Sequence, residues 1–252
     1  MVSKDLGFIL KRFNFRETSV IATLYLYNYG KVRGILKGFY TNKREFASPL
    51  DIFSLNEFLF YPKKSEIWLV SHVDIISDYG YLRSDLAKAK IAGQIFNFVD
   101  KVTQLWDSNP YIFNLLKNCL NLLENEKESI VLYAFLVKFL TLSGFKPELN
   151  HCISCRKVLE QENTFSVSKG GFVCPRCRSQ VKDVRVLSQQ ASRCISYIQN
   201  SDFPLVNRLQ IPFNCQEEIL SILSSFTAYH LDTDCLGNLP AANYLYAKKR
   251  GV

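Results

Sequence analysis

The stretch Cys152-Ile153-Ser154-Cys155, followed after an eighteen-residue loop by Cys174-Pro175-Arg176-Cys177, decides the fold of the second half of this chain. Each Cys-x-x-Cys pair can hold one edge of a tetrahedral ion, and the loop is long enough to bring the two pairs together. Within the loop, Ser168-Lys169-Gly170-Gly171 predicts a hairpin turn that returns the chain to the second pair. The spacing therefore predicts a zinc site with four ligands: Cys152, Cys155, Cys174 and Cys177.

Other uses of these cysteines are less consistent with the pattern. The remaining cysteines lie scattered in apolar, helix-like surroundings, as reduced core cysteines do, which disfavours a disulfide framework. A thioredoxin-like redox site needs one Cys-x-x-Cys pair in a βαβ context, which this stretch lacks. His151 is an alternative ligand in place of one cysteine. Four sulfur ligands leave no open position for water, so we expect a structural ion and not a catalytic one.

The composition favours a globular protein with a polyanionic partner. The chain has 252 residues, 48% of them hydrophobic, and a formal net charge of +8. We expect nucleic acid and not a membrane as the partner, because no basic amphipathic anchor is evident. The start of the chain lacks the pattern of a signal peptide, and the longest apolar run, Ile130 to Leu142, contains Lys138 and is too short to span a bilayer. These features predict a cytoplasmic protein.

The first third of the sequence has the pattern of β structure. Short runs rich in Val, Ile, Tyr and Phe alternate with turn residues, and they predict five strands, at Gly7–Phe13, Thr18–Tyr27, Lys31–Lys37, Ile52–Tyr61 and Ile67–Ile75. Five strands favour a small barrel. The oligonucleotide-binding (OB) fold is the leading candidate, although the number of strands alone leaves SH3-like and other barrels open.

Positive charge is concentrated in this region. Residues 1–46 contain nine Lys or Arg and three acidic residues. With a period of two, Lys31, Arg33 and Lys37 lie on one face of the third predicted strand. Basic residues interleaved with aromatics suit single-stranded nucleic acid, because phosphates attract cations and unstacked bases stack on rings. The candidate residues for contact with nucleic acid are Lys11, Arg12, Arg16, Lys31, Arg33, Lys37, Phe39, Tyr40, Lys43 and Arg44. The alternative is that the cations are simply solvated and that Phe39 or Tyr40 closes one end of the barrel.

Helical periodicity begins near residue 80. Apolar residues at helical spacing predict helices over Leu82–Leu105, Ile112–Leu123 and Ile130–Leu142, with Gly144 as the cap of the third. Ser188 is expected to cap a helix through Ile198, and Asn214 another that runs past Leu231. The chain is thus predicted to be an α+β multidomain protein with an OB domain at 1–79, a helical domain at 80–147 and 182–252, and an inserted four-cysteine zinc module at 148–181.

No constellation typical of an enzyme is evident, because the three histidines are isolated and no phosphate-binding glycine loop is present.

The order of these parts resembles the RecO family of bacterial recombination mediators. The residues that carry the resemblance are Phe8-Ile9-Leu10-Lys11, Phe15-Arg16-Glu17-Thr18-Ser19, Tyr29-Gly30-Lys31-Val32-Arg33-Gly34, Lys37-Gly38, Pro49-Leu50, Leu142-Ser143-Gly144-Phe145-Lys146-Pro147 and Gly170-Gly171-Phe172-Val173-Cys174-Pro175-Arg176-Cys177. One departure is Phe39-Tyr40-Thr41-Asn42, which stands where relatives are often densely basic.

The resemblance implies a DNA repair protein without catalytic turnover. Proteins of this kind bind single- and double-stranded DNA through the barrel and anneal complementary strands. They engage RecR and the acidic C-terminal tail of single-stranded DNA-binding protein (SSB), and help to load RecA. Two other classes remain as alternatives: a zinc-ribbon protein that acts on RNA or in transcription, and an interaction scaffold that binds proteins alone.

Overall fold

The fold comes from a computed structural model, and the structure describes residues 2–41, 46, 49–63, 65–126, 128–159 and 164–233. The described residues form two compact units, which divide between residues 124 and 125. Each unit is described by itself below.

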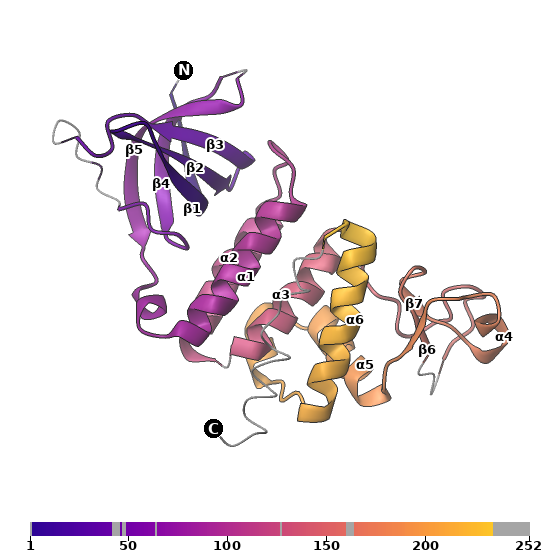
Figure 1. The fold of residues 1–252 in the computed structure, drawn as a ribbon. Coiled ribbons are helices and arrows are strands. Elements are labelled where there is room, and N and C mark those ends of the chain that lie inside the picture. Colours follow the sequence, from indigo (N-terminus) through magenta and orange to yellow (C-terminus); the bar gives the residue numbers. More distant parts are fainter. Residues whose placement is uncertain are drawn as a thin grey trace. The chain divides into compact units, whose positions relative to one another are not determined.

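The first unit begins with a closed five-stranded barrel (Figure 1). Its strands are β1 (Ser3–Phe15), β2 (Ser19–Leu26), β3 (Gly30–Leu36), β4 (Leu55–Tyr61) and β5 (Ile67–Ser77). The order around the barrel is β1-β2-β3-β5-β4, and β3 and β5 pair in parallel while the other neighbours are antiparallel. The predicted barrel of OB type is confirmed. All five strands overlap their predicted ranges. Strands β1 and β5 are longer than predicted, and β4 starts at Leu55 instead of Ile52.

Alternating burial explains why these segments close into a barrel. In β3 every second residue, from Gly30 to Leu36, is buried, while Arg33 between them is exposed. The inward residues of all five strands form one apolar core that includes Leu24, Phe58 and Val70. Gly30 starts β3 with φ +65°, and an added Cβ there would overlap the backbone of the segment that follows α1. The β2–β3 turn therefore requires glycine at this position.

Two helices pack on the barrel within the first unit. They are α1 (Leu86–Val102), which Asp85 caps through Lys88 N, and α2 (Pro110–Asn125). Phe8 of β1 contacts Phe96 of α1 and Phe113 of α2, with ring centroids 5.7 and 5.1 Å apart. These aromatic contacts fix α1 against the barrel, so side chains of α1 lie beside the barrel strands.

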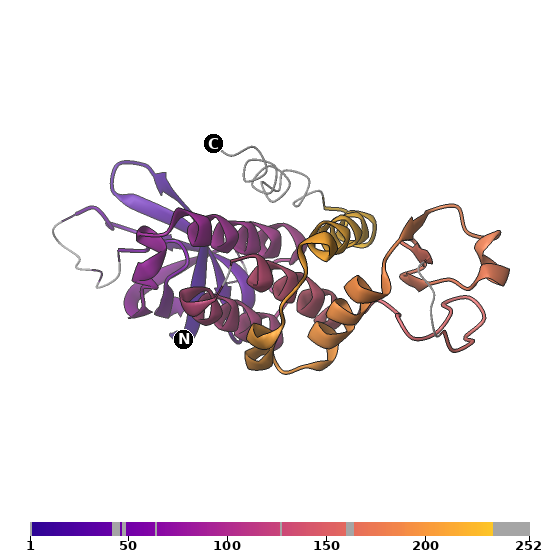
Figure 2. The same ribbon diagram turned by 90° about the horizontal axis from the view of Figure 1, so that it is seen from below.

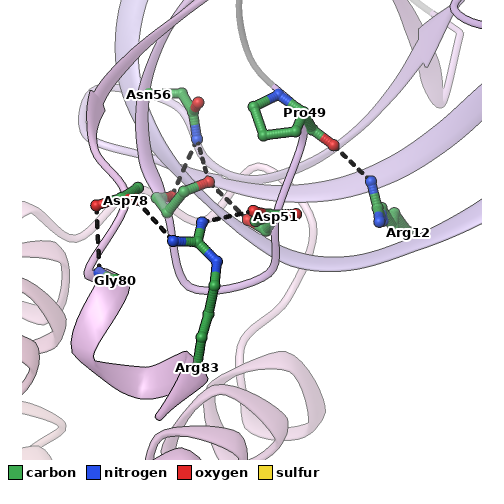
Figure 3. Close-up of polar contacts among 8 residues, drawn as sticks. Arg12, Pro49, Asp51, Asn56, Asp78, Gly80 and Arg83 are labelled. Atoms are coloured by element: carbon green, nitrogen blue, oxygen red, sulfur yellow. Dashed lines mark hydrogen bonds and ion pairs between the residues drawn. The ribbon is translucent and has the colours of Figure 1, made fainter.

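A polar cluster fastens the connection from β5 to α1 (Figure 3). This connection contains the 3₁₀ helix η1 (Gly80–Arg83), and the Arg83 guanidinium lies between the carboxylates of Asp78 and Asp51, at 2.7 and 2.8 Å. The Asp78 carboxylate also accepts from Gly80 N. Arg83 thereby ties the end of β5 to the loop that leads into β4.

The second unit is built on α3 (Glu128–Leu142), α5 (Gln189–Asn200) and α6 (Phe213–Leu231), with the 3₁₀ helix η2 (Phe203–Arg208) between α5 and α6. Helix α3 is buried on nearly all sides, as its apolar sequence predicts. Gly144, with φ +83°, closes it: Phe145 N donates to Leu140 O and Gly144 N to Thr141 O, which is a Schellman cap. None of the described helices is long and apolar enough to cross a membrane.

The predicted ends of α5 and α6 have different outcomes. Ser188 caps α5 as expected, because its side chain accepts from Ala191 N. The predicted cap of α6 is wrong: the helix starts at Phe213, after Pro212, so Asn214 lies inside its first turn. Helix α6 also stops at Leu231, because Asp232 takes the left-handed conformation, with φ 46°.

The four-cysteine module lies between α3 and α5 in the sequence and to one side of α5 and α6 (Figures 1 and 2). It contains β6 (Thr164–Ser166), β7 (Gly171–Phe172), the short helix α4 (Pro175–Arg178) and β8 (Val184–Val186), in a sheet of order β7-β6-β8. The predicted hairpin is present, since β6 and β7 pair antiparallel. The Phe165 ring contacts Phe226 of α6 at 6.1 Å, so the module packs on the helices through its sheet.

Candidate metal centre and nucleic-acid interface

The four cysteines predicted from the spacing lie together. The Sγ atoms of Cys152, Cys155, Cys174 and Cys177 are all within 4.8 Å of one another. Cys155 Sγ and Cys174 Sγ are 3.7 Å apart. A tetrahedral ion with Zn–S bonds of about 2.3 Å would hold its sulfurs about 3.8 Å apart, so the cluster fits one such ion.

The backbone around each pair is arranged to aim the sulfurs inward. Arg156 N donates to Cys152 O, and Arg178 N to Cys174 O, so each pair sits in a tight turn. Arg156 has φ 62°, a conformation that glycine adopts more easily. Cys174 N donates to Cys152 Sγ at 3.4 Å, which joins the first turn to the second.

The thiols are electrostatically unequal. Burial raises the pKa of Cys152, but N–H donors from Cys174, Cys155 and Ser154 outweigh it and lower this pKa to about 6. The pKa of Cys177 is raised to about 12, chiefly by its hydrogen bond with Cys174, and also by burial. Four thiolates cannot crowd together without a cation to offset their charge. A metal ion at this position would supply that charge, with all four sulfurs as its ligands.

His151 stands apart from this cluster. Its ring lies 3.5 Å from the Glu148 carboxylate and is about half exposed, and it does not belong to the group of ligand atoms. Among the residues that the structure describes, the four cysteines are the one group of three or more His, Cys, Asp or Glu side chains that could hold a metal. Four sulfur ligands would fill the tetrahedral coordination sphere of one ion.

The candidate nucleic-acid interface is the outer face of β1, β2 and β3. Strand register aligns Lys11, Thr23 and Arg33 in one row across the three strands. A second row on the same face contains Phe13, Ile21 and Ile35. Cations and an exposed aromatic ring therefore lie side by side on this face.

The cations of this face pair with two carboxylates, Asp100 and Glu66, and both come from outside the barrel strands. Lys11 Nζ lies 2.6 Å from Asp100 Oδ2, near the end of α1, and Arg33 Nη1 lies 3.3 Å from Glu66 Oε2. The side chains of Arg33 and Glu66 are 48% and 66% exposed. Exposed pairs of this kind are weak and exchange readily with other anions.

Lys31 differs from the expectation that it presents its charge to solvent. Its side chain is 12% exposed, and Nζ donates to the backbone oxygen of Asp100 at 2.5 Å and lies 3.8 Å from the Asp100 carboxylate. Burial lowers the pKa of Lys31, and the charge of Asp100 opposes this shift. The Lys31 side chain points outward from β3, as predicted, but α1 covers it. In the free protein Lys31 therefore holds α1 against β3.

Other predicted residues gather at the end of the barrel where β1 meets β2. Arg12 donates to the backbone oxygen of Pro49 at 2.6 Å and so holds the loop before β4 (Figure 3). Arg16, in the β1–β2 turn with φ 56°, lies over the Phe15 ring, and its side chain is exposed. Lys37, directly after β3, is also exposed. Lys43 and Arg44 lie outside the described residues.

Phe39 and Tyr40 have separate roles. Phe39 packs against the barrel core and contacts Phe46, with ring centroids 5.4 Å apart, as the barrel-closing alternative predicted. Tyr40 is 51% exposed, and its hydroxyl donates to Asn14 Oδ1 at 2.7 Å. Of the two rings, Tyr40 is the one available to a ligand.

The outer face also borders a groove that the sequence did not predict. It has a volume of about 630 Å³, and its lining includes Lys11, Phe13 and Arg33 from the strands with Asp100, Gln104 and Leu105 from the end of α1 and beyond. Leu105 forms a β-bridge with Lys31, and Trp106 N donates to Lys31 O at 2.8 Å, so this segment is fixed along β3. No signal in the sequence links Asp100 to Lys31, which is 69 residues away.

Comparison with known proteins identifies the family. The profile described as "Recombination protein O N terminal" matches residues 1–79, and "Recombination protein O C terminal" matches residues 83–238. Similar relatives include DNA repair protein RecO of Alkaliphilus metalliredigens, 25% identical over 92% of this chain and 95% of that protein. DNA repair protein RecO of Dehalococcoides mccartyi is 29% identical over 87% of this chain and 85% of that protein. The chain therefore belongs to the RecO family of DNA repair and recombination proteins, which act as mediators and not as enzymes.

Proposed function

We propose that this protein binds single- and double-stranded DNA through the outer face of β1, β2 and β3, anneals complementary strands, and helps to load RecA. The observation that carries the proposal is the row of Lys11 and Arg33 beside the row that contains Phe13. Cations on this face neutralise phosphates, so two strands repel each other less while they pair.

The proposed contact residues differ in whether they are exposed or paired with a carboxylate in the free protein. Arg16, Lys37 and Tyr40 are exposed and can meet DNA directly. Lys11 and Arg33 meet it by exchanging a carboxylate for a phosphate, which costs little because both cations are about half exposed. We assign supporting parts to three of the other predicted residues: Arg12 and Phe39 hold the loop after β3, and Lys31 holds α1. Lys43 and Arg44 are further candidates for phosphate contacts.

In this proposal the four-cysteine cluster binds one Zn²⁺, which stabilises the fold of residues 148–181. Four thiolate donors suit zinc, and a structural zinc contributes directly to folding. The barrel at 1–79 then contacts DNA, while the helical parts at 80–147 and 182–252 carry the protein contacts. Membership of the family supports RecR and the acidic tail of SSB as partners, and the cytoplasm, at the nucleoid, as the location.

The test is the salt dependence of binding to a fluorescent oligothymidylate, measured by anisotropy. For each phosphate contact on a single strand, affinity falls by about 0.7 decades per decade of salt. The double variant Arg33→Ala with Lys37→Ala should lower this slope by about 1.4, the sum for two contacts. The matched control is Lys117→Ala, which removes an exposed cation on α2 that does not line the groove beside the outer face.

Three results would overturn the proposal. They are a slope that the double variant leaves unchanged, a slope that Lys117→Ala lowers equally, and RNA that displaces DNA at equal concentration. Strand annealing, followed with complementary labelled oligonucleotides, should slow in the double variant and keep its rate in the control. Wild-type protein that does not accelerate annealing would remove that part of the proposal.

A further inference from the structure

The groove beside the outer face has the size and walls of a ligand site. Its volume of about 630 Å³ lies inside the range of about 300–1,000 Å³ that small-ligand pockets show. One wall is the barrel and the other is the end of α1 with the segment after it, which packs along β3 through the bridge between Lys31 and Leu105. Both walls belong to the same compact unit. The site is therefore preformed in the free protein.

Charge is distributed unevenly within the groove. Lys11 and Arg33, 51% and 48% exposed, place cations at its rim. The carboxylate of Asp100 is 15% exposed and lies deeper, beside Lys31. A phosphate is attracted to the rim and repelled by the carboxylate within. An anionic ligand should therefore keep its charge at the rim and turn its uncharged part inward.

The rest of the lining suits a flat, partly polar ring. Phe13 is 53% exposed and Ile67 is 37% exposed, and both line the groove. Gln104, which is exposed, brings an amide with donors and an acceptor. Aromatic rings bind unstacked bases of any sequence, and an amide can pair with the edge of a base.

We propose that this groove seats one unstacked nucleotide of single-stranded DNA, with its base against Phe13 and Gln104 and its phosphate at Lys11 and Arg33. A base that is paired and stacked in a duplex cannot enter, so the groove favours single strands over duplex. The proposal rests on the DNA-binding function proposed above, and it extends the DNA site from the barrel to the end of α1.

The test compares single-stranded and duplex DNA for the variants Phe13→Ala and Gln104→Ala. Both side chains are exposed, so the substitutions should leave the fold intact, which thermal unfolding checks. Phe13→Ala should weaken single-strand binding by about tenfold, a typical loss for one base–ring contact, and change duplex binding by less than about twofold. Gln104→Ala should act in the same direction. The control is Tyr111→Ala, which removes a ring on α2 that is 71% exposed and does not line the groove.

A strand with abasic sites provides a second readout, because it keeps the phosphates and removes the bases. The affinity ratio between the normal and the abasic strand should be about tenfold smaller for Phe13→Ala than for wild type. Equal losses on single strand and duplex, or an unchanged abasic ratio, would overturn the groove proposal while DNA binding itself stands. Wild-type protein that binds neither form of DNA would instead overturn the proposed function.

Discussion

Replacing Asp100 with asparagine should tighten the binding of single-stranded DNA. In the free protein the Asp100 carboxylate lies 2.6 Å from Lys11 Nζ and 3.8 Å from Lys31 Nζ. A phosphate that reaches Lys11 must displace this carboxylate and is also repelled by it. Asparagine has nearly the same shape as aspartate and carries no charge. Asp100→Asn therefore removes the charge that competes with the phosphate and keeps the walls of the groove in place.

The structure sets the size of the effect. The side chains of Lys11 and Asp100 are 51% and 15% exposed, and partly exposed pairs contribute about 0.2–1 kcal/mol. Their removal should raise affinity by about 1.4- to 5-fold. Lys11 contacts a phosphate in both proteins in the proposed complex, so the salt slope should change by less than the about 0.7 that one whole contact contributes. Lys31 keeps its bond to the backbone oxygen of residue 100, so the free energy of unfolding should fall by less than about 1 kcal/mol.

The assay is anisotropy with an oligothymidylate at several salt concentrations, together with thermal unfolding. The matched control is Glu57→Gln, which breaks the pair of Lys4 and Glu57 at 2.6 Å, whose residues do not line the groove. This control corrects for the general effect of one negative charge fewer. The reasoning fails if folded Asp100→Asn protein binds DNA no better than wild type, or if Glu57→Gln gains as much affinity.

Three further predictions concern the metal site, two glycines and one ion pair. Cys152→Ser should abolish stoichiometric zinc, measured by metal analysis of reduced protein, and unfold the module while DNA affinity stays unchanged. Gly30→Ala should lower the free energy of unfolding by at least about 2 kcal/mol, because the new Cβ would overlap a backbone carbonyl. Gly144→Ala should lower it by about 1 kcal/mol, because the new Cβ would meet open space. Denaturant titration measures both values. Hydrogen bonds from Arg83 hold the pKa of Asp78 below its usual value. These bonds therefore make their full contribution to the free energy of unfolding above about pH 4, and this contribution is lost as the pH falls further. Asp78→Asn should flatten the acid unfolding curve there, followed by the fluorescence of the two tryptophans, both in the first unit.

Local patterns were sufficient to predict much of the fold. The alternation of Lys31 to Lys37 gave the direction of each side chain in β3, because the period of a strand is independent of what packs on it. The spacing of the cysteines gave the ligand cluster, because four thiols within one short segment have few other arrangements. Gly144 marked the end of α3, since the left-handed cap favours glycine.

The sequence could not predict what each cation faces. The direction of Lys31 followed from the strand, but its burial depends on α1, whose Asp100 is distant in the chain. Arg12 likewise donates to Pro49, 37 residues away, and this contact depends on where the loop crosses the barrel. The wrong cap of α6 has a local cause: Pro212 fixes the start of the helix one residue before the side chain that was expected to cap it.

The partner of each cation decides which substitution can test DNA binding. Removing Lys31 together with Arg33 would confuse two effects, because Lys31 joins β3 to α1 through the Asp100 backbone and its loss would loosen that wall of the groove. Arg33 contacts only the exposed carboxylate of Glu66 among the ion pairs of the described residues, so its loss changes the charge and little else. Lys37 is exposed beyond the end of β3. A weaker salt slope after the loss of Arg33 and Lys37 therefore measures phosphate contacts, whereas the same result after the loss of Lys31 could come from a displaced helix.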